Sequence, residues 1–212
     1  MRTVEKFYID LLNRYPALSN CGESIVAAYE KLVTCYENAG KLMVCGNGGS
    51  AADAEHIVGE LMKGFLLKRE MTDEEKIAFN PSPDCSDLTT NLQRALPAIS
   101  LCGHSALMTA YSNDVKPELI FAQQVFGFGK KGDCLLALST SGNSENVVNA
   151  VRTAKNMRIS TLSITGEKES KLSQLCDVCI RLPATETYIV QEYTLPVYHA
   201  LCAMLEYTFF DD

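Results

Sequence analysis

Short apolar runs alternate with stretches of helical periodicity along most of this chain. Five runs predict β-strands, at residues 42–45, 98–102, 134–138, 160–164 and 178–182. The stretches that follow them predict helices at about 50–66, 105–126, 144–157, 169–175 and 190–210. Strands this apolar leave no face for water, so they predict a parallel sheet covered by helices on both sides. With right-handed crossovers, the expected fold class is α/β, a three-layer α/β/α sandwich with a five-stranded parallel sheet.

Two segments depart from this alternation. Residues 1–40 carry no strand signal, and their apolar positions predict two N-terminal helices, broken near residues 16–20, that we expect at a subunit interface. Residues 68–94 form a polar insertion in which Thr72 and Glu75 have the spacing of a helix capping box. A loop this long in a compact domain is usually functional or disordered. It is interpreted either as a partly ordered lid over a ligand or as a solvated insertion.

Composition limits the classes of protein that fit this sequence. With 212 residues and 47% hydrophobic content the chain can bury one full core, so a single domain over 1–212 is expected. A net charge of −7 without a basic stripe argues against nucleic acid and anionic membranes as partners. No run approaches the roughly 18 to 20 apolar residues of a membrane span, and the first residues lack the apolar core of a signal peptide. A cytoplasmic location is therefore expected.

The cysteines give a second indication of a reducing compartment. There are nine, an odd number, and several lie within apolar runs, so reduced and buried thiols are predicted rather than a disulfide framework. Cys176 and Cys179 have the spacing of a redox or metal pair, but no second pair completes a zinc site. They are interpreted as core residues.

Two loops rich in glycine and hydroxyl groups each follow a strand and precede a helix. Residues 46–50 read Gly-Asn-Gly-Gly-Ser, and residues 139–144 read Ser-Thr-Ser-Gly-Asn-Ser. Backbone N–H groups and hydroxyls at the positive end of a helix bind phosphate, and the carboxyl ends of parallel strands meet at one edge of the sheet. We therefore expect the two loops to be halves of one phosphosugar site. A nucleotide cofactor is disfavoured, because the first loop lacks the Gly-Lys-Ser/Thr of a P-loop and has Ala51 at the third glycine of the dinucleotide fingerprint.

Candidate acid–base and metal-ligating residues lie on two of the predicted helices. His56 and Glu60 are four residues apart, so their side chains share one helix face about 6 Å apart at Cβ. That spacing fits an ion pair, a pair of metal ligands, or acid–base machinery. Gln191 and His199 are eight apart, which on an unbroken helix is about 12 Å of rise and about 80° of rotation, too far for both to reach one small site. Either Pro196 makes this helix irregular, or the two residues serve neighbouring sites, one of them across a subunit boundary.

Taken together, these residues make the chain resemble the sugar isomerase (SIS) domain and, within it, the phosphoheptose isomerase family, which converts sedoheptulose 7-phosphate to glycero-manno-heptose 7-phosphate. The resemblance implies a flavodoxin-like sheet and an aldose–ketose isomerase that works through an enediol. The segments that carry it, in this order, are residues 45–56, 60–65, 96–99, 113–114, 132–144, 191–192 and His199.

The resemblance also implies roles for individual residues. Glu60 is expected to be the general base and His199 the general acid or second base. A zinc ion, bound in some members, is expected on His56, Glu60, Gln191 and His199. The residues expected to hold the phosphate or sugar are Asn47, Gly48, Gly49, Ser50, Asp114, Ser139, Thr140, Ser141, Ser144 and Gln191. A homotetramer with sites built between subunits is implied as well.

Two alternatives to this function stay open at the level of sequence. SIS domains also serve as non-catalytic binding modules, including a replication-initiator-associating protein and sugar-phosphate-sensing regulators; the former lacks the catalytic glutamate and histidine that this chain has as Glu60 and His199. The other alternative is an isomerase for a different sugar phosphate. Three departures from the family pattern bear on the substrate: Thr194 in place of a frequent histidine, Pro196 within the last helix, and the insertion at 68–94.

Overall fold

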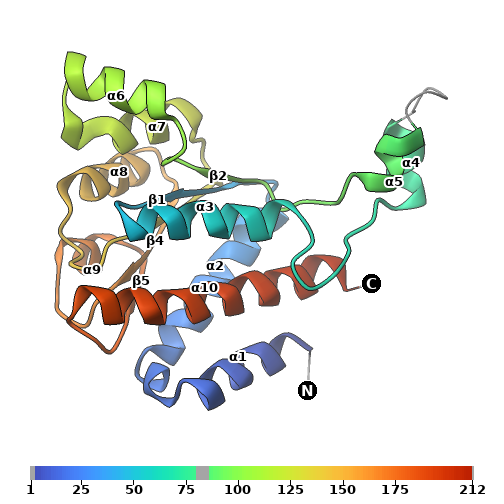
Figure 1. The fold of residues 1–212 in the computed structure, drawn as a ribbon, viewed down its shortest axis with the longest axis horizontal. Coiled ribbons are helices and arrows are strands. Elements are labelled where there is room, and N and C mark those ends of the chain that lie inside the picture. Colours follow the sequence, from blue (N-terminus) through green and yellow to red (C-terminus); the bar gives the residue numbers. More distant parts are fainter. Residues whose placement is uncertain (1–2, 80–85, 212) are drawn as a thin grey trace.

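A five-stranded parallel sheet forms the centre of the molecule (Figure 1). The computed structural model describes residues 3–79 and 86–211. The strand order is β2-β1-β3-β4-β5, which is the flavodoxin-like order for a doubly wound sheet. The strands are β1 (Leu42–Cys45), β2 (Ala98–Ser100), β3 (Cys134–Leu138), β4 (Ser160–Thr165) and β5 (Val178–Arg181). The predicted fold class is confirmed.

Helices cover both faces of the sheet. One face packs against a core built from α1 (Thr3–Arg14), the 3₁₀ turn η1 (Pro16–Cys21), α2 (Gly22–Glu37), α3 (Gly49–Met62) and α10 (Thr187–Phe210). The other face packs against α7 (Ile120–Phe128), α8 (Glu145–Asn156) and α9 (Lys171–Leu175). Alternate residues of a strand point to opposite faces, so Leu42 and Val44 enter the first core while Met43 and Cys45 enter the second. Burial on both faces explains why these strands are apolar throughout.

The single helix predicted at 105–126 is wrong. The chain there forms α6 (Ser105–Asp114), the 3₁₀ turn η3 (Pro117–Leu119) and α7. Pro117 has no N–H to donate and disfavours helical dihedrals at the residue before it, and Lys116 is extended with φ −157° and ψ 126°. The apolar periodicity of residues 105–126 therefore does not outweigh this proline.

Two other helix boundaries differ from prediction. The helix expected at 50–66 ends at Met62, because Lys63 is extended. The last helix begins at Thr187 and continues unbroken past Pro196 to Phe210. The hypothesis of an irregular helix at Pro196 is therefore wrong, although this proline still removes one backbone donor from the helix.

The insertion forms an arm, which we define as the described residues 68–79 and 86–94. It carries α4 (Asp73–Phe79) and α5 (Ser86–Asn91), and Figure 1 shows both standing apart from the body beyond the C-terminal end of α3. The predicted capping box is present: the Thr72 N–H donates to Glu75 Oε2 (2.8 Å) and the Glu75 N–H donates to Thr72 Oγ1 (3.1 Å). Within one chain the arm does not cover the loop at the opposite, N-terminal end of α3.

Eight of the nine cysteines lie in the described part of the chain, and all eight are free thiols; Cys85 lies outside it. Burial raises the pKa of the thiols of Cys45, Cys134 and Cys202. Among the described residues, Cys176 and Cys179 join no cluster of potential metal ligands. Across the same residues, no helix has both the length and the apolarity that crossing a membrane requires.

Candidate active site

The two glycine- and hydroxyl-rich loops lie next to each other. The side-chain amides of Asn47, in the first loop, and Asn146, in the first turn of α8, exchange two hydrogen bonds of 3.0 and 2.9 Å. The two loops follow β1 and β3, which are neighbours in the sheet. Parallel strands end at the same edge, so this contact follows from the topology.

The second loop keeps its hydroxyl groups free of helix capping. Ser144 occupies the N-cap position of α8, yet its side chain forms no cap hydrogen bond and instead lies 3.1 Å from Ser139 Oγ. The loop turns at Gly142, whose φ is +65° and whose N–H donates to the Ser139 carbonyl (3.0 Å). Paired hydroxyls at the positive end of α8 suit an anion.

We expect the substitution Gly142→Ala to lower the free energy of unfolding by about 1 to 3 kcal/mol, because a side chain strains this left-handed backbone. A Cβ would also lie 2.1 Å from the Oγ of Ser170, which caps α9. The measurement is urea unfolding at fixed protein concentration. Gly59→Ala is the control: a Cβ there meets nothing within 4 Å, and alanine in the middle of α3 should raise stability by about 0.5 to 1 kcal/mol. Equal effects of the two substitutions would contradict this account.

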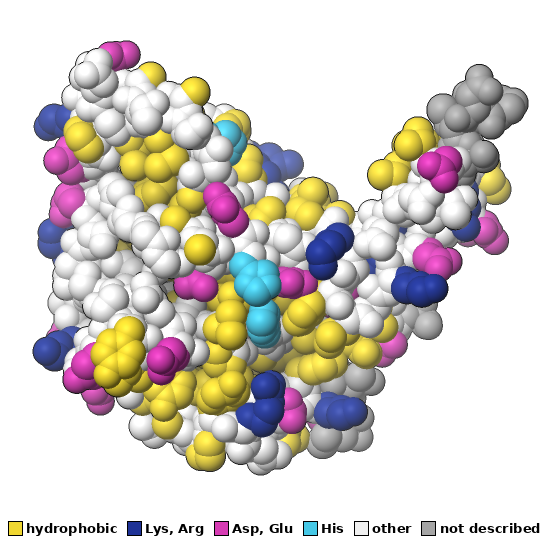
Figure 2. All heavy atoms as spheres, viewed as in Figure 1, with side chains coloured by type: hydrophobic (Ala, Val, Ile, Leu, Met, Phe, Trp, Pro, Cys, Tyr) yellow, Lys and Arg dark blue, Asp and Glu magenta, His cyan; other side chains and the backbone are white. Residues whose placement is uncertain are grey.

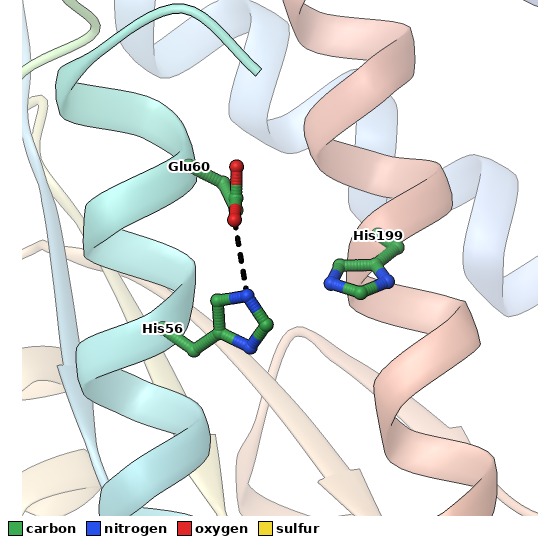
Figure 3. Close-up of side chains that lie close together, drawn as sticks. All are labelled: His56, Glu60 and His199. Atoms are coloured by element: carbon green, nitrogen blue, oxygen red, sulfur yellow. Dashed lines mark hydrogen bonds and ion pairs between the residues drawn. The ribbon is translucent and has the colours of Figure 1, made fainter. Parts of the chain in front are cut away.

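Helices α3 and α10 run side by side in the same direction and bring three side chains together (Figure 3). His56 and Glu60 extend from α3, and His199 extends from α10 toward them. One ligand atom from each residue lies within 4.8 Å of the other two. We call these three residues the His/Glu/His cluster; it forms within a single chain.

The two carboxylate oxygens of Glu60 have different surroundings. Oε1 lies 3.0 Å from His56 Nε2, whereas Oε2 is buried without a hydrogen-bond partner and has only the Lys63 ammonium 3.6 Å away. The side chain is 12% exposed. A buried carboxylate oxygen with unused lone pairs can accept a proton or bind a cation.

His199 is the second member of the cluster with an unsatisfied atom. Its Nε2 is buried without a hydrogen-bond partner, and its ring lies 5.0 Å from the His56 ring, centroid to centroid. Burial, and next the nearby His56, lower the pKa of His199 below its ordinary value, while Glu60 opposes them. The imidazole is therefore neutral at pH 7, the form that binds a metal or accepts a proton.

The lowered pKa of His199 predicts a pH dependence of stability in metal-free protein. Below about pH 6.5 the unfolded chain takes up the His199 proton more readily than the folded chain, so the free energy of unfolding falls as the pH falls. We expect His199→Gln to lose stability less steeply than the unchanged chain between about pH 7 and about pH 5.5. Urea unfolding in the presence of a chelator measures this slope. His104→Gln, at the start of α6, controls for loss of an imidazole, and an unchanged slope in His199→Gln would refute the prediction.

The cluster reaches the surface of the molecule. His56 is 44% exposed, and Figure 2 shows histidine side chains in the middle of this face with acidic and hydrophobic side chains beside them. A small ligand can therefore approach the buried oxygen and nitrogen from solvent.

Comparison with known proteins agrees with this geometry. A model of the SIS domain matches residues 104–206, and a second SIS domain model matches residues 13–95. The phosphoheptose isomerase of Rhodospirillum rubrum is 35% identical over 189 residues, covering 89% of this chain and 88% of its own, and that of Nitratiruptor sp. is 37% identical over 184 residues, covering 85% and 86%. The chain belongs to the phosphoheptose isomerase family. The solved structure of the phosphoheptose isomerase of Neisseria gonorrhoeae is similar, with a TM-score of 0.72 at 29% identity, over 94% of this chain and 96% of that one.

Gln191, which the family resemblance places among the zinc ligands, lies at the other end of the site in this chain. Its amide is beside Gly49 at the start of α3, where an added Cβ would come within 2.6 Å of Nε2. The unbroken helix carries His199 two turns farther along. Gln191 therefore contacts the first loop, and its role as a metal ligand stays a prediction.

The remaining predicted binding residues are spread over both loops and α6. Gly48 (φ +58°) and Gly49 begin α3, and Ser50 is buried in its first turn. Thr140 and Ser141 line a pocket of about 270 Å³ that Lys168 also borders. Asp114 is exposed at the end of α6, where its carboxylate accepts a hydrogen bond from Asn113 (2.8 Å).

Sequence reasoning missed a buried ion pair that holds the end of α3. Glu206, on α10, accepts hydrogen bonds from the backbone N–H groups of residues 65–67 and from Arg69 Nε (2.6 Å). Arg69 in turn donates to the carbonyls of Leu61 (2.7 Å) and Glu60 (3.0 Å), the last turn of α3. Both side chains are 0% exposed. This pair ties Glu60, α10 and the base of the arm together; no local pattern in the sequence marks it.

Proposed function

We propose that this protein interconverts sedoheptulose 7-phosphate and D-glycero-D-manno-heptose 7-phosphate. The observation that carries the proposal is the meeting of His199 with Glu60 of the helix that begins at the first of the two paired phosphate-type loops, in a chain of the phosphoheptose isomerase family. A non-catalytic SIS module has no need for a buried carboxylate oxygen and an imidazole nitrogen that are both left without partners.

The reaction moves a carbonyl between C2 and C1, and Glu60 is the proton carrier in this proposal. Its Oε2 removes a proton from C1 of the ketose, giving an enediol, and returns the proton to C2 to form the aldose. Oε1 lies 3.0 Å from His56 Nε2, and this contact holds the carboxylate in place. The neutral imidazole of His199 moves the proton between the two substrate oxygens.

The phosphate anchors the far end of the sugar in the two loops. Asn47, Gly48, Gly49 and Ser50 supply N–H and side-chain groups at the start of α3, and the second loop supplies hydroxyls. Ser50 and Glu60 are ten residues apart, about 15 Å of helical rise, so the phosphate end and the reacting end lie toward opposite ends of α3. Binding energy at the phosphate is then available to orient the reacting carbons.

The His/Glu/His cluster also fits a zinc ion. Two imidazoles and a carboxylate are a typical zinc donor set, and tetrahedral donors about 2.0 Å from the metal lie roughly 3.3 Å apart, close to the 3.0 Å between His56 Nε2 and Glu60 Oε1. The unpartnered Glu60 Oε2 and His199 Nε2 supply further donors. When bound, zinc would polarise the substrate carbonyl. The family resemblance also assigns Gln191 as a ligand, although within one chain its amide lies beside Gly49 at the start of α3.

We further propose a cytoplasmic homotetramer. The reduced thiols fit a reducing compartment. Exposed Tyr188 and Leu195 on α10 and Ile9 on α1 fit faces covered by other subunits. A neighbouring subunit would bring further residues, Asp114 among them, to the phosphosugar. Light scattering during gel filtration measures the assembly.

The test is isomerisation of sedoheptulose 7-phosphate followed by NMR in deuterated water. We expect an aldose product that carries deuterium at C2, because the carboxylate exchanges its proton with solvent before returning it. Turnover of ribulose or fructose phosphates in preference to the heptulose would show another substrate. The absence of any exchange would reject catalysis and favour a binding module.

A further inference from the structure

A tyrosine hydroxyl joins His56 to a second carboxylate. Tyr198 Oη lies 2.8 Å from His56 Nδ1 and 3.4 Å from Asp53 Oδ1. Asp53 and His56 come from α3, and Tyr198 comes from α10, directly before His199. Tyr198 is 1% exposed, and its ring packs edge-on against both His56 and His199, with centroids 5.5 and 4.9 Å away. Packing against both imidazole rings therefore holds the Tyr198 ring in place, and its hydroxyl has two hydrogen-bond partners.

The two ring nitrogens of His56 face different groups, so the tautomer of His56 decides which of them can bind a metal ion. Nε2 faces Glu60 in the His/Glu/His cluster, and Nδ1 faces Tyr198. A neutral imidazole carries one N–H, so Nε2 can bind a metal only when the proton is on Nδ1. In that state Nδ1–H donates to Tyr198 Oη, and the tyrosine O–H has to find another acceptor. Asp53 is that acceptor.

We propose that Tyr198 and Asp53 are positioning residues that hold His56 in the tautomer whose Nε2 lone pair faces the metal site. Hydrogen bonds of this kind, from a ligating imidazole to a carboxylate, fix ring orientation and raise the basicity of the ligand. Here the Tyr198 hydroxyl, which comes from α10, lies between the His56 imidazole and the Asp53 carboxylate, which both come from α3. The inference rests on the metal site of the proposed function, and it adds two residues that touch neither metal nor substrate.

The hydrogen bonds that join His56, Tyr198 and Asp53, which we call the relay, also account for a half-buried carboxylate that forms no salt bridge with the described residues. Asp53 is half-buried in the second turn of α3, and burial raises its pKa while the Tyr198 hydrogen bond and His56 oppose that rise. A carboxylate in such a place costs desolvation unless a donor reaches it. Tyr198 is the donor that the structure supplies.

The experiment is zinc binding to metal-free protein, by competition with a chromophoric chelator and without substrate. Tyr198→Phe keeps the ring and removes the hydroxyl, and we expect it to weaken zinc binding about 10- to 100-fold. Tyr193→Phe, on the same helix, is the matched control and should bind zinc as the unchanged chain does. Thermal unfolding of each variant verifies that it folds.

A double substitution tests whether Asp53 acts on zinc binding through Tyr198 or independently of it. Asp53→Asn alone should weaken zinc binding, because an amide is a poorer acceptor than a carboxylate. Asp53→Asn in the Tyr198→Phe background should add nothing, since Asp53 acts through the tyrosine hydroxyl. The inference is overturned if Tyr198→Phe binds zinc within twofold of the unchanged chain, if the two effects multiply, or if the unchanged chain binds no zinc. A protein whose zinc affinity responds as expected, but which isomerises no sugar phosphate, would reject the proposed function and leave the relay standing.

Discussion

Glu60→Gln is expected to reduce kcat for sedoheptulose 7-phosphate by about 100- to 10,000-fold, the usual loss when a positioned general base is removed. Glutamine keeps the shape of the side chain and can still place a polar atom against His56 Nε2. It cannot take a proton from carbon. Because the loops proposed to hold the phosphate lie at the other end of α3, KM should change far less than kcat. Steady-state kinetics with deuterium incorporation at C2 measures both.

The control for this substitution is Glu55→Gln. Glu55 lies on the same helix and is exposed, and it belongs to no part of the His/Glu/His cluster. Its substitution should leave kcat within a few-fold of the unchanged chain. A Glu60→Gln protein that still places deuterium at C2 at the normal rate would show that another group carries the proton.

Glu206→Ala is expected to lower the free energy of unfolding by about 3 to 5 kcal/mol, as breaking a buried ion pair usually does. The substitution strands the guanidinium of Arg69, which is 0% exposed, and it removes the acceptor of three backbone N–H groups at residues 65–67. Urea unfolding at fixed protein concentration measures the loss, since subunit association would also contribute to stability.

An exposed ion pair provides the comparison. Arg152 and Glu145 form a 3.0 Å pair with side chains 49% and 42% exposed, and Arg152→Ala should cost far less stability than Glu206→Ala because solvent screens the exposed pair. Glu206→Ala should also reduce catalysis, because Arg69 holds the carbonyl of Glu60 and so sets the end of α3. A loss of stability no larger than that of Arg152→Ala would show that the pair does not clamp the site.

The local sequence pattern predicted the structure correctly wherever a single helix, strand or strand–loop–helix unit determines it. The five strands and the two phosphate-type loops stand where periodicity and glycine chemistry put them, and the capping box at Thr72 and Glu75 is present. Pattern failed where two local signals competed. Between 105 and 126 the apolar periodicity argued for one helix and Pro117 against it, and the proline prevailed because it withholds a hydrogen bond that no neighbour replaces. At Pro196 the opposite happened, since α10 is buried along most of its length and packing holds the helix together.

By itself the sequence determined the fold class, the membership of the two loops in one edge of the sheet, and the shared helix face of His56 and Glu60, because each follows from local periodicity and from the rule that parallel strands end at the same edge. Tertiary structure alone decided that His199 meets that face within one chain, that Gln191 contacts Gly49 instead, and that Asn146, Arg69, Glu206 and Tyr198 support the site. These contacts join segments about 100 or more residues apart. Apart from the Asn47–Asn146 contact, they depend on the direction and register in which α10 packs on α3. Side-chain periodicity along one helix specifies which face is buried but not which residue lies opposite.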